Sequence, residues 1–171
     1  ADNLAKVANE LMNGPYGWGG LYGKRDCSST LMDLFSPFGI WLPRNSGHQA
    51  KITGAFTDFK NLSPEEKENN ILQRGLPYFS LLWMRGHIML YIGNQDGHAL
   101  AFHNFWSVRT RDSHGRTGKK VIGRTAITTL RPGLELRHGK GAGDLLPSIL
   151  GMTILWPPPL APIIVPEERE E

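Results

Sequence analysis

Apolar positions in the first third of the chain recur with helical spacing. One apolar face is predicted over residues 2–13, before Gly14-Pro15, and it consists of Leu4, Val7, Ala8, Leu11 and Met12. A second face follows Cys27 and consists of Leu31, Met32, Leu34 and Phe35. Pro37 and Gly39 predict the end of this second helix, since proline and glycine both interrupt helical backbone.

Two further helical signals are shorter. The segment His48–Phe56 is predicted to form another helix, packed beside the site at Cys27. Ser63-Pro64-Glu65-Glu66 has the order of an N-cap, a proline at the first helical position and acidic residues in the first turn. This order predicts a short, mostly polar helix or turn.

From Leu76 onwards the pattern becomes typical of strands separated by hairpin turns. Turn signals occur at Asn94–Gly97 and at Asp112–Gly118. The predicted strands are Phe79–Met84, His87–Gly93, Ala99–Trp106, Val108–Arg111, Lys120–Arg124 and Ala126–Leu130, with Gly151–Trp156 covering an edge. We therefore expect an α+β fold, in which N-terminal helices pack on a C-terminal antiparallel sheet.

The composition is that of one soluble globular domain, with 40% hydrophobic and 20% charged residues among 171. We expect this domain to span residues 1–156, and a Pro-rich and acidic tail of extended polyproline type to span residues 157–171. No apolar stretch approaches the ~20 residues of a membrane span, and no signal peptide is visible at Ala1.

A net charge of +3 is compatible with an anionic partner such as a cell wall or a nucleic acid. The basic positions are concentrated between Arg109 and Arg124, where the aromatic residues of a single-strand nucleic-acid platform are missing. This run is typical of a solvated face, so no nucleic-acid partner is expected.

Cys27 is the only cysteine, so it can form neither an internal disulfide nor a thiolate metal cluster. It lies at or just before a helix start, because Ser28, Ser29 and Thr30 are good initiators of the following helix. Unpaired N–H groups and the positive end of the helix dipole favour a thiolate there. Cys27 is therefore either a buried, inert residue or the nucleophile of a hydrolase that needs no metal or cofactor.

Such a nucleophile needs a base and a group that orients the base. His87 begins one predicted strand and His103 lies in its hairpin partner. A loop of Asn94–Asp96 places His103 opposite His87, whereas a two-residue Asp96-Gly97 loop turns His103 to the other face unless a bulge restores it. A loop of Asn94–Gly97 would instead bring Asn104 opposite His87, and asparagine is also a workable orienting residue.

Five blocks along residues 2–106 resemble the NlpC-type cell-wall cysteine peptidases. They are Pro15-Tyr16-Gly17-Trp18-Gly19-Gly20, Asp26-Cys27-Ser28, Leu42-Pro43-Arg44 with Ser46 and Gln49, the segment His87–Gly93, and Phe102-His103. The resemblance implies a papain-like fold, with Cys27 as nucleophile, His87 as base and His103 as orienting residue. It further implies that Tyr16 and the Cys27 N–H stabilise the oxyanion.

The same resemblance implies hydrolysis of peptidoglycan stem peptides, at the bond between D-glutamate and the diamino acid, in the periplasm or outside the cell. Asp26 and Ser28 would hold a free stem-peptide amine, and Trp18 is either a substrate contact or a core aromatic. Wall-binding domains are expected outside this chain. Two departures are Ser29 in place of a usual glycine and Tyr78–Gly86 in place of a Pro-Gly-Asp lead. An amidase or acyltransferase on the same fold, or a non-catalytic wall-binding module, remains the alternative.

Overall fold

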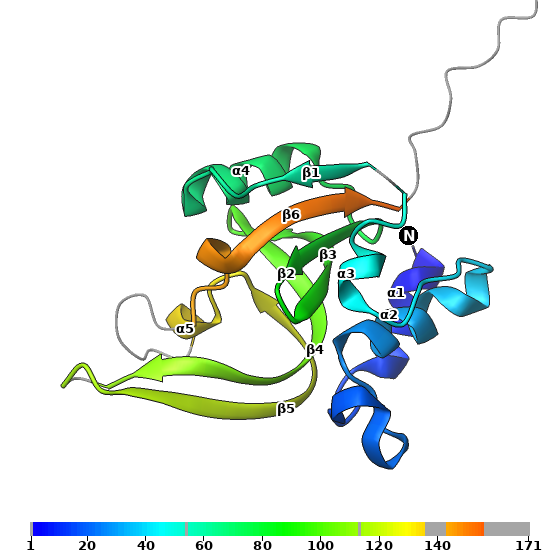
Figure 1. The fold of residues 1–171 in the computed structure, drawn as a ribbon, viewed down its shortest axis with the longest axis horizontal. Coiled ribbons are helices and arrows are strands. Elements are labelled where there is room, and N and C mark those ends of the chain that lie inside the picture. The colour runs from blue at the N-terminus through cyan, green and yellow to red at the C-terminus, as the bar shows by residue number, and fades with distance from the viewer. Residues whose placement is uncertain (1, 54, 113, 136–142, 156–171) are drawn as a thin grey trace, which may run out of the picture.

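The computed structural model describes residues 2–53, 55–112, 114–135 and 143–155 (Figure 1). The predicted tail at 157–171 lies outside these residues. The helices are α1 Asp2–Leu11, α2 Cys27–Phe35, α3 Ser46–Gln49, α4 Pro64–Arg74 and α5 Pro132–Glu135, with short 3₁₀ turns η1 Trp18–Gly23, η2 Ser36–Phe38 and η3 Leu146–Ser148. The strands are β1 Phe56–Asp58, β2 Ser80–Met84, β3 His87–Gln95, β4 His98–Arg111, β5 Thr117–Thr129 and β6 Ile149–Ile154.

The six strands form one antiparallel sheet in the order β1-β6-β2-β3-β4-β5. Three helices, α1, α2 and α3, lie together beside this sheet, and α4 lies near β1 (Figure 1). The predicted α+β class is confirmed.

Alternation along β3 explains how helices can cover both faces of the sheet, because successive side chains of a strand point to opposite faces. Ile88 and Leu90 join the cluster that contains Leu31 and Leu34 of α2. Met89 and Tyr91 join a second cluster with Ile71 of α4 and Phe59. A strand covered on both faces is apolar at nearly every position, and this explains the continuous apolar run of β3.

Two segments differ from the sequence-based expectation. The helix predicted over His48–Phe56 is a single turn, α3, and Phe56 instead begins β1. The segment predicted to cover an edge, Gly151–Trp156, contributes to β6, which is inserted between β1 and β2. Both differences are long-range pairings, between β1 and β6 and between β6 and β2, that local pattern does not specify.

The four strands predicted between Ala99 and Leu130 are two long ones, β4 and β5. They form a hairpin whose far end extends away from the rest of the sheet at the lower left of Figure 1. A register shift between Phe105 and Ser107 marks an irregularity where this extension begins. Among the described residues, no helix has the length and apolar character needed to cross a bilayer.

Candidate active site

Cys27 is the first residue of α2, and Asp26 is its N-cap. The Asp26 carboxylate accepts a hydrogen bond from the Ser29 N–H, and the Ser29 hydroxyl accepts one from the Asp26 N–H, which completes a capping box. This local sequence fixes the start of the helix at the sulfur. Cys27 therefore lies at a helix start, as the sequence predicted.

Cys27 is only 8% exposed and packs in the cluster formed by α1, α2 and the sheet. Burial raises the pKa of the thiol, although the N–H of Ile88, the residue after His87, donates to the sulfur and acts in the opposite direction. The expectation that the helix start favours a thiolate is therefore wrong for the free protein, because desolvation outweighs the helix terminus. The resting group is a thiol.

The hairpin that carries the two histidines has a two-residue turn at Asp96-Gly97, with positive φ values of 51° and 79°. Gln95 pairs with His98 beside the turn, but after a register shift between Tyr91 and Gly93 the pairing becomes Leu90 with Phe102. The irregularity returns His103 to the face of His87, as anticipated for a bulged two-residue loop.

His87 and His103 are in direct contact through their rings, with His87 Nε2 2.9 Å from His103 Nδ1. His103 Nε2 lies 3.0 Å from the Thr128 hydroxyl, and this hydroxyl donates its own proton to the Thr129 carbonyl. Thr128 can therefore only accept from His103, so His103 carries its proton on Nε2 and accepts from His87 on Nδ1. His87 is then protonated on Nε2, which leaves its Nδ1 free to accept a proton.

Both imidazoles are neutral in the resting protein. Burial lowers the pKa of His87 to about 4, although the charge of Asp26 acts to raise it. Burial, together with the neighbouring His87, lowers the pKa of His103 well below its usual value. Phe105 contributes to this apolar setting, because its ring stacks on His103 with centroids 4.0 Å apart.

Asp26 is paired with Arg44, which comes from the loop before α3. The Arg44 guanidinium lies 2.6 Å from Asp26 Oδ2 and 3.1 Å from Oδ1, and it donates to the Ser28 hydroxyl at 2.7 Å. Burial alone would raise the pKa of Asp26, but hydrogen bonds from Arg44 and Ser29 together lower it. Gln49 donates to the carbonyls of Ser28 and Pro43 and so fixes this loop against α2.

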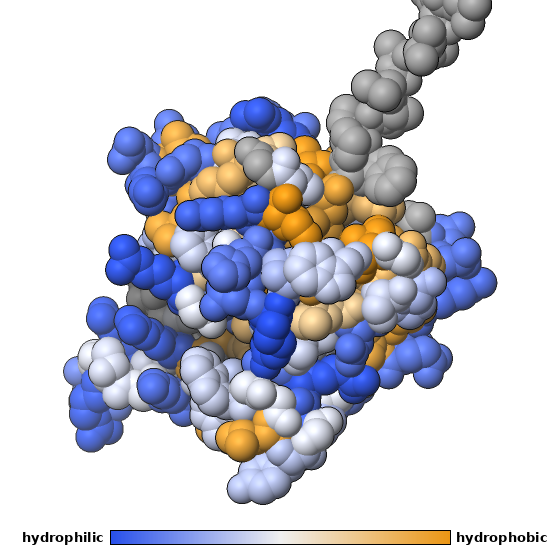
Figure 2. All heavy atoms as spheres, turned by 45° about the vertical axis from the view of Figure 1, so that its right-hand side comes forward, coloured by the Kyte–Doolittle hydropathy of each residue, from blue (hydrophilic) through white to orange (hydrophobic). Residues whose placement is uncertain are grey.

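Tyr16 lies close enough to Cys27, Asp26 and Arg44 to interact with their charges, and Trp18 follows two residues later. Burial, and then the charges of Cys27 and Asp26, raise the pKa of Tyr16, so its hydroxyl is a neutral donor near the sulfur. Trp18 is 70% exposed, which excludes the core interpretation. It lines a cleft of about 570 Å³ with Tyr16, Tyr22 and Trp106. In Figure 2, pale and orange side chains gather at the lower end of the molecule, where η1 lies.

Asn104 does not approach His87. Its side-chain amide donates to the Arg25 carbonyl at 3.1 Å, and the residue is fully buried opposite Thr125 of β5. Asn104 therefore stabilises the segment that leads into Cys27. This placement favours His103 over Asn104 as the group that orients His87.

Sequence reasoning assigned no role to Arg44 or Thr128. Arg44 belongs to the Leu42-Pro43-Arg44 block that resembles the family, so this block could have indicated a role for Arg44 in the site. Thr128 had no sequence signal, because its contact with His103 arises from the pairing of β5 with β4. Within the described ranges, no group of three or more His, Cys, Asp or Glu residues is placed to hold a metal ion.

Comparisons with known proteins agree with this arrangement. The sequence model of the NlpC/P60 family matches residues 13–119. A solved structure of an NlpC/P60 endopeptidase from Photobacterium damselae subsp. piscicida has 29% sequence identity and a TM-score of 0.75, over 89% of this chain and 38% of that chain. An NlpC/P60 family protein from Bacillus cereus ATCC 10987 has 18% identity and a TM-score of 0.55, over 91% and 40%. No curated protein sequence matches. The chain thus spans about two fifths of each of these two solved proteins. These neighbours confirm the predicted papain-like fold class.

Proposed function

Because the chain belongs to the NlpC/P60 family, we propose that it is a cysteine peptidase that hydrolyses peptidoglycan stem peptides. The observation that carries this proposal is the ordered chain of Thr128, His103 and His87. This chain ends next to the helix start at Cys27, because the N–H of Ile88, the residue after His87, donates to the Cys27 sulfur. A module that only binds the cell wall does not require an imidazole whose orientation and protonation are set by two further residues. We further propose that the enzyme acts in the cell envelope or outside the cell.

The first half of the reaction forms a thioester. As the Cys27 sulfur attacks the carbonyl carbon of the substrate, its proton passes to Nδ1 of His87 and the carbonyl electron pair moves to oxygen. The Cys27 N–H and the Tyr16 hydroxyl donate to this oxyanion. When the intermediate collapses, the C–N bond breaks and the leaving nitrogen takes the proton from His87.

The second half releases the acid. A water molecule gives one proton to His87 while its oxygen attacks the thioester carbon. Collapse expels the sulfur, which recovers the proton from His87, so the thiol and the neutral imidazole are restored. His103 keeps the same His87 nitrogen available in both halves, because it accepts the Nε2 proton throughout.

The proposed bond is the one between D-glutamate and the diamino acid. The acyl half would lie on the side of Tyr16, near Asp26, Ser28 and the exposed Trp18. Arg44 already neutralises Asp26, so this side presents one guanidinium and one carboxylate together. An amidase or acyltransferase on the same scaffold is the alternative, and product analysis separates these reactions.

The direct test uses purified protein and a defined stem peptide, with products identified by mass spectrometry. The wild-type protein should yield a fragment ending in D-glutamate and a second fragment beginning with the diamino acid. The variants Cys27→Ala and His87→Ala should be inactive while their circular dichroism spectra remain native. Full activity of Cys27→Ala would exclude the proposed mechanism, and a product cut at another bond would select the alternative chemistry.

A further inference from the structure

The crevice at His87 continues into a larger pocket. The crevice has a volume of about 220 Å³ and contains His87, His103 and Phe105 in its wall. The pocket has a volume of about 430 Å³ and lies between the outer part of β4 and the segment that leads into β6. Met84, Ser107 and Leu145 line both, so the two form a continuous depression.

The order of groups along this depression gives it a direction. Tyr16 and Trp106 line both the aromatic cleft and the His87 crevice, so the crevice lies between the cleft and the pocket. In the proposed reaction His87 gives its proton to the leaving nitrogen, so the leaving half of the substrate lies on the His87 side. The pocket beyond the crevice is therefore where that half would extend.

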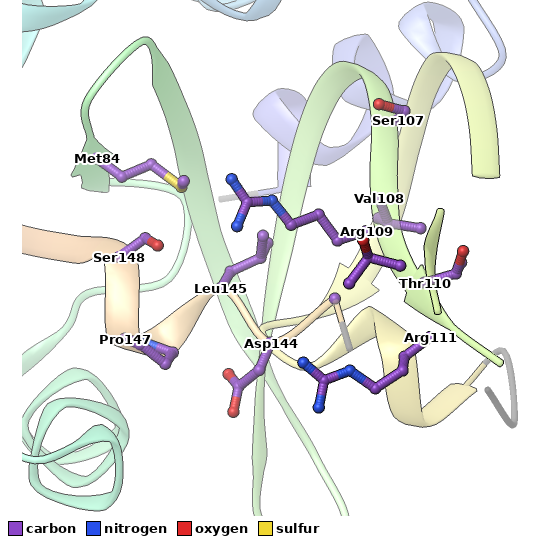
Figure 3. Close-up of a pocket in the computed structure, with 12 residues that line it drawn as sticks. Met84, Ser107, Val108, Arg109, Thr110, Arg111, Asp144, Leu145, Pro147 and Ser148 are labelled. Carbon is purple, nitrogen blue, oxygen red and sulfur yellow. The ribbon is translucent and has the colours of Figure 1, made fainter. Parts of the chain in front are cut away.

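Cationic groups without carboxylate partners line one wall of this pocket. Arg109 and Arg111 are alternate residues of β4 and so lie on one face of the strand. Figure 3 shows the guanidinium of Arg109 directed between Met84 and Leu145, and that of Arg111 on the side of Asp144. Neither guanidinium has an ion pair within the part of the chain that the structure describes.

The neighbouring strand increases this positive charge. Lys119 of β5 is paired directly with Arg109 across the hairpin, and like charges at such positions are destabilising. Farther along the same hairpin, Arg116 has its own partner in Asp112, at 2.6 Å. Arg109 and Arg111 are thus available for an anion, whereas Arg116 is already neutralised.

Asp144 supplies the opposite charge on the facing wall. Its Oδ1 accepts from the Leu146 N–H at 3.0 Å and so fixes the start of η3. Among the described residues, Oδ2 has no hydrogen-bond partner and no cation is paired with this carboxylate. The pocket therefore presents two guanidinium groups and one free carboxylate oxygen, a combination that suits a zwitterion.

We propose that this pocket binds the leaving half of the substrate, as an amino acid or short peptide with a free C-terminal carboxylate and a side-chain ammonium. Arg109 and Arg111 pair with the carboxylate, and Asp144 pairs with the ammonium. The inference rests on the proposed peptidase function, because that function supplies a diamino acid as the leaving amine. It goes further because it assigns residues that recognise the carboxylate and the side-chain ammonium of this leaving group.

The kinetic test compares a stem peptide that ends in lysine carboxylate with the same peptide ending in a carboxamide. Wild-type kcat/KM should be about tenfold higher for the carboxylate, the scale of one charge-assisted contact. The double variant Arg109→Gln/Arg111→Gln should lose this preference through KM. The matched control Arg116→Gln, on the same hairpin, should keep it. Asp144→Asn retains an oxygen that can accept from the Leu146 N–H and should remove discrimination between lysine and Nε-acetyl-lysine.

A binding measurement separates failure of the pocket from failure of the proposed reaction. Isothermal titration of the Cys27→Ala protein with Lys-D-Ala dipeptide should give binding that weakens about tenfold with the dipeptide amide or with the double arginine variant. Carboxylate-dependent binding supports the pocket even if no peptide is cleaved. Equal wild-type cleavage of acid and amide peptides, with no difference between the two dipeptides in titration, would overturn the pocket and leave the peptidase proposal intact.

Discussion

The Thr128 hydroxyl lies 3.0 Å from Nε2 of His103 and donates its own proton to the Thr129 carbonyl. This relationship makes a neutral threonine the outermost member of the hydrogen-bond chain that ends at His87. A carboxylate at this place would favour a charged imidazolium, whereas a hydroxyl sets the tautomer without adding charge. The arrangement suits two histidines that burial already keeps neutral.

Replacing Thr128 by valine should lower kcat by about tenfold. The variant removes the acceptor for the His103 Nε2 proton, and a hydrogen bond of about 1.4 kcal/mol, near the upper end of the usual range, corresponds to a tenfold change. Steady-state kinetics on the stem peptide would measure the effect. Thr125→Val is the matched control, since Thr125 is a buried threonine of the same strand whose hydroxyl bonds the Gly14 carbonyl. Equal losses in both variants would point to a packing effect instead.

The two histidines should differ in their sensitivity to substitution. We expect His87→Ala to have no measurable activity, because no other described group is placed to accept the thiol proton of Cys27. We expect His103→Ala to retain a trace, with kcat reduced by up to ~10⁴ through loss of the tautomer. Asn104→Ala should act mainly on stability, with a lower melting temperature and only a small change in kcat, because the Asn104 amide donates to the Arg25 carbonyl. A fully active His103→Ala with an inactive Asn104→Ala would reverse the assignment.

The acid limb of the pH profile should lie near the pKa of about 4 given to His87 by its burial. In the proposed mechanism the neutral imidazole of His87 is the base, so kcat/KM should stay level as the pH falls through 6.5, the usual histidine pKa, and decrease only near 4. A profile that halves near pH 6.5 would show that His87 titrates as an exposed histidine.

The same shift predicts how the free energy of unfolding depends on pH. Since the pKa of His87 is lower in the native state, the unfolded chain takes up a proton between pH 6.5 and about 4 that the folded chain does not. Stability should therefore decrease as the pH falls through this window. Urea titrations at several pH values would measure it, and His87→Gln should show a shallower decrease.

Acetylation of the stem-peptide N-terminus tests the role of Asp26. Arg44 binds both of its oxygens, so an ammonium would have to compete with a guanidinium already in place. We expect kcat/KM for one tripeptide to be about the same with and without N-acetylation. Asp26→Asn should reduce stability and activity on both peptides alike, since it weakens the ion pair and the cap. A strong preference for the free amine that Asp26→Asn abolishes would instead favour amine binding.

Alkylation of Cys27 should be slower than that of a model thiol at neutral pH. Cys27 is 8% exposed and burial raises the pKa of its thiol, so little thiolate is available to react. Iodoacetamide labelling followed by mass spectrometry would give the rate. Urea should increase this rate as the protein unfolds, and faster labelling of the native protein than of the model thiol would contradict the buried thiol.

Local sequence was sufficient for features that depend on neighbours in the chain. Asp26, Cys27 and Ser29 are close in sequence, so the helix start and its capping could be predicted from residue types alone. The same holds for Ser63 and Glu66 at the start of α4. The order of the five blocks that resemble the family was sufficient to predict the family, and the pattern of helices followed by strands was sufficient to predict the α+β class.

Tertiary structure decided what depends on pairing and burial. A turn of two residues places His103 on the wrong face of β4, and only the irregularity after Tyr91 returns it to His87. The sequence left this choice open because a one-residue shift in strand pairing moves every later side chain to the opposite face of the sheet. The same residues are compatible with either pairing. Likewise the helix start at Cys27 favours a thiolate, but packing of α2 on the sheet buries the sulfur, and desolvation is the larger effect.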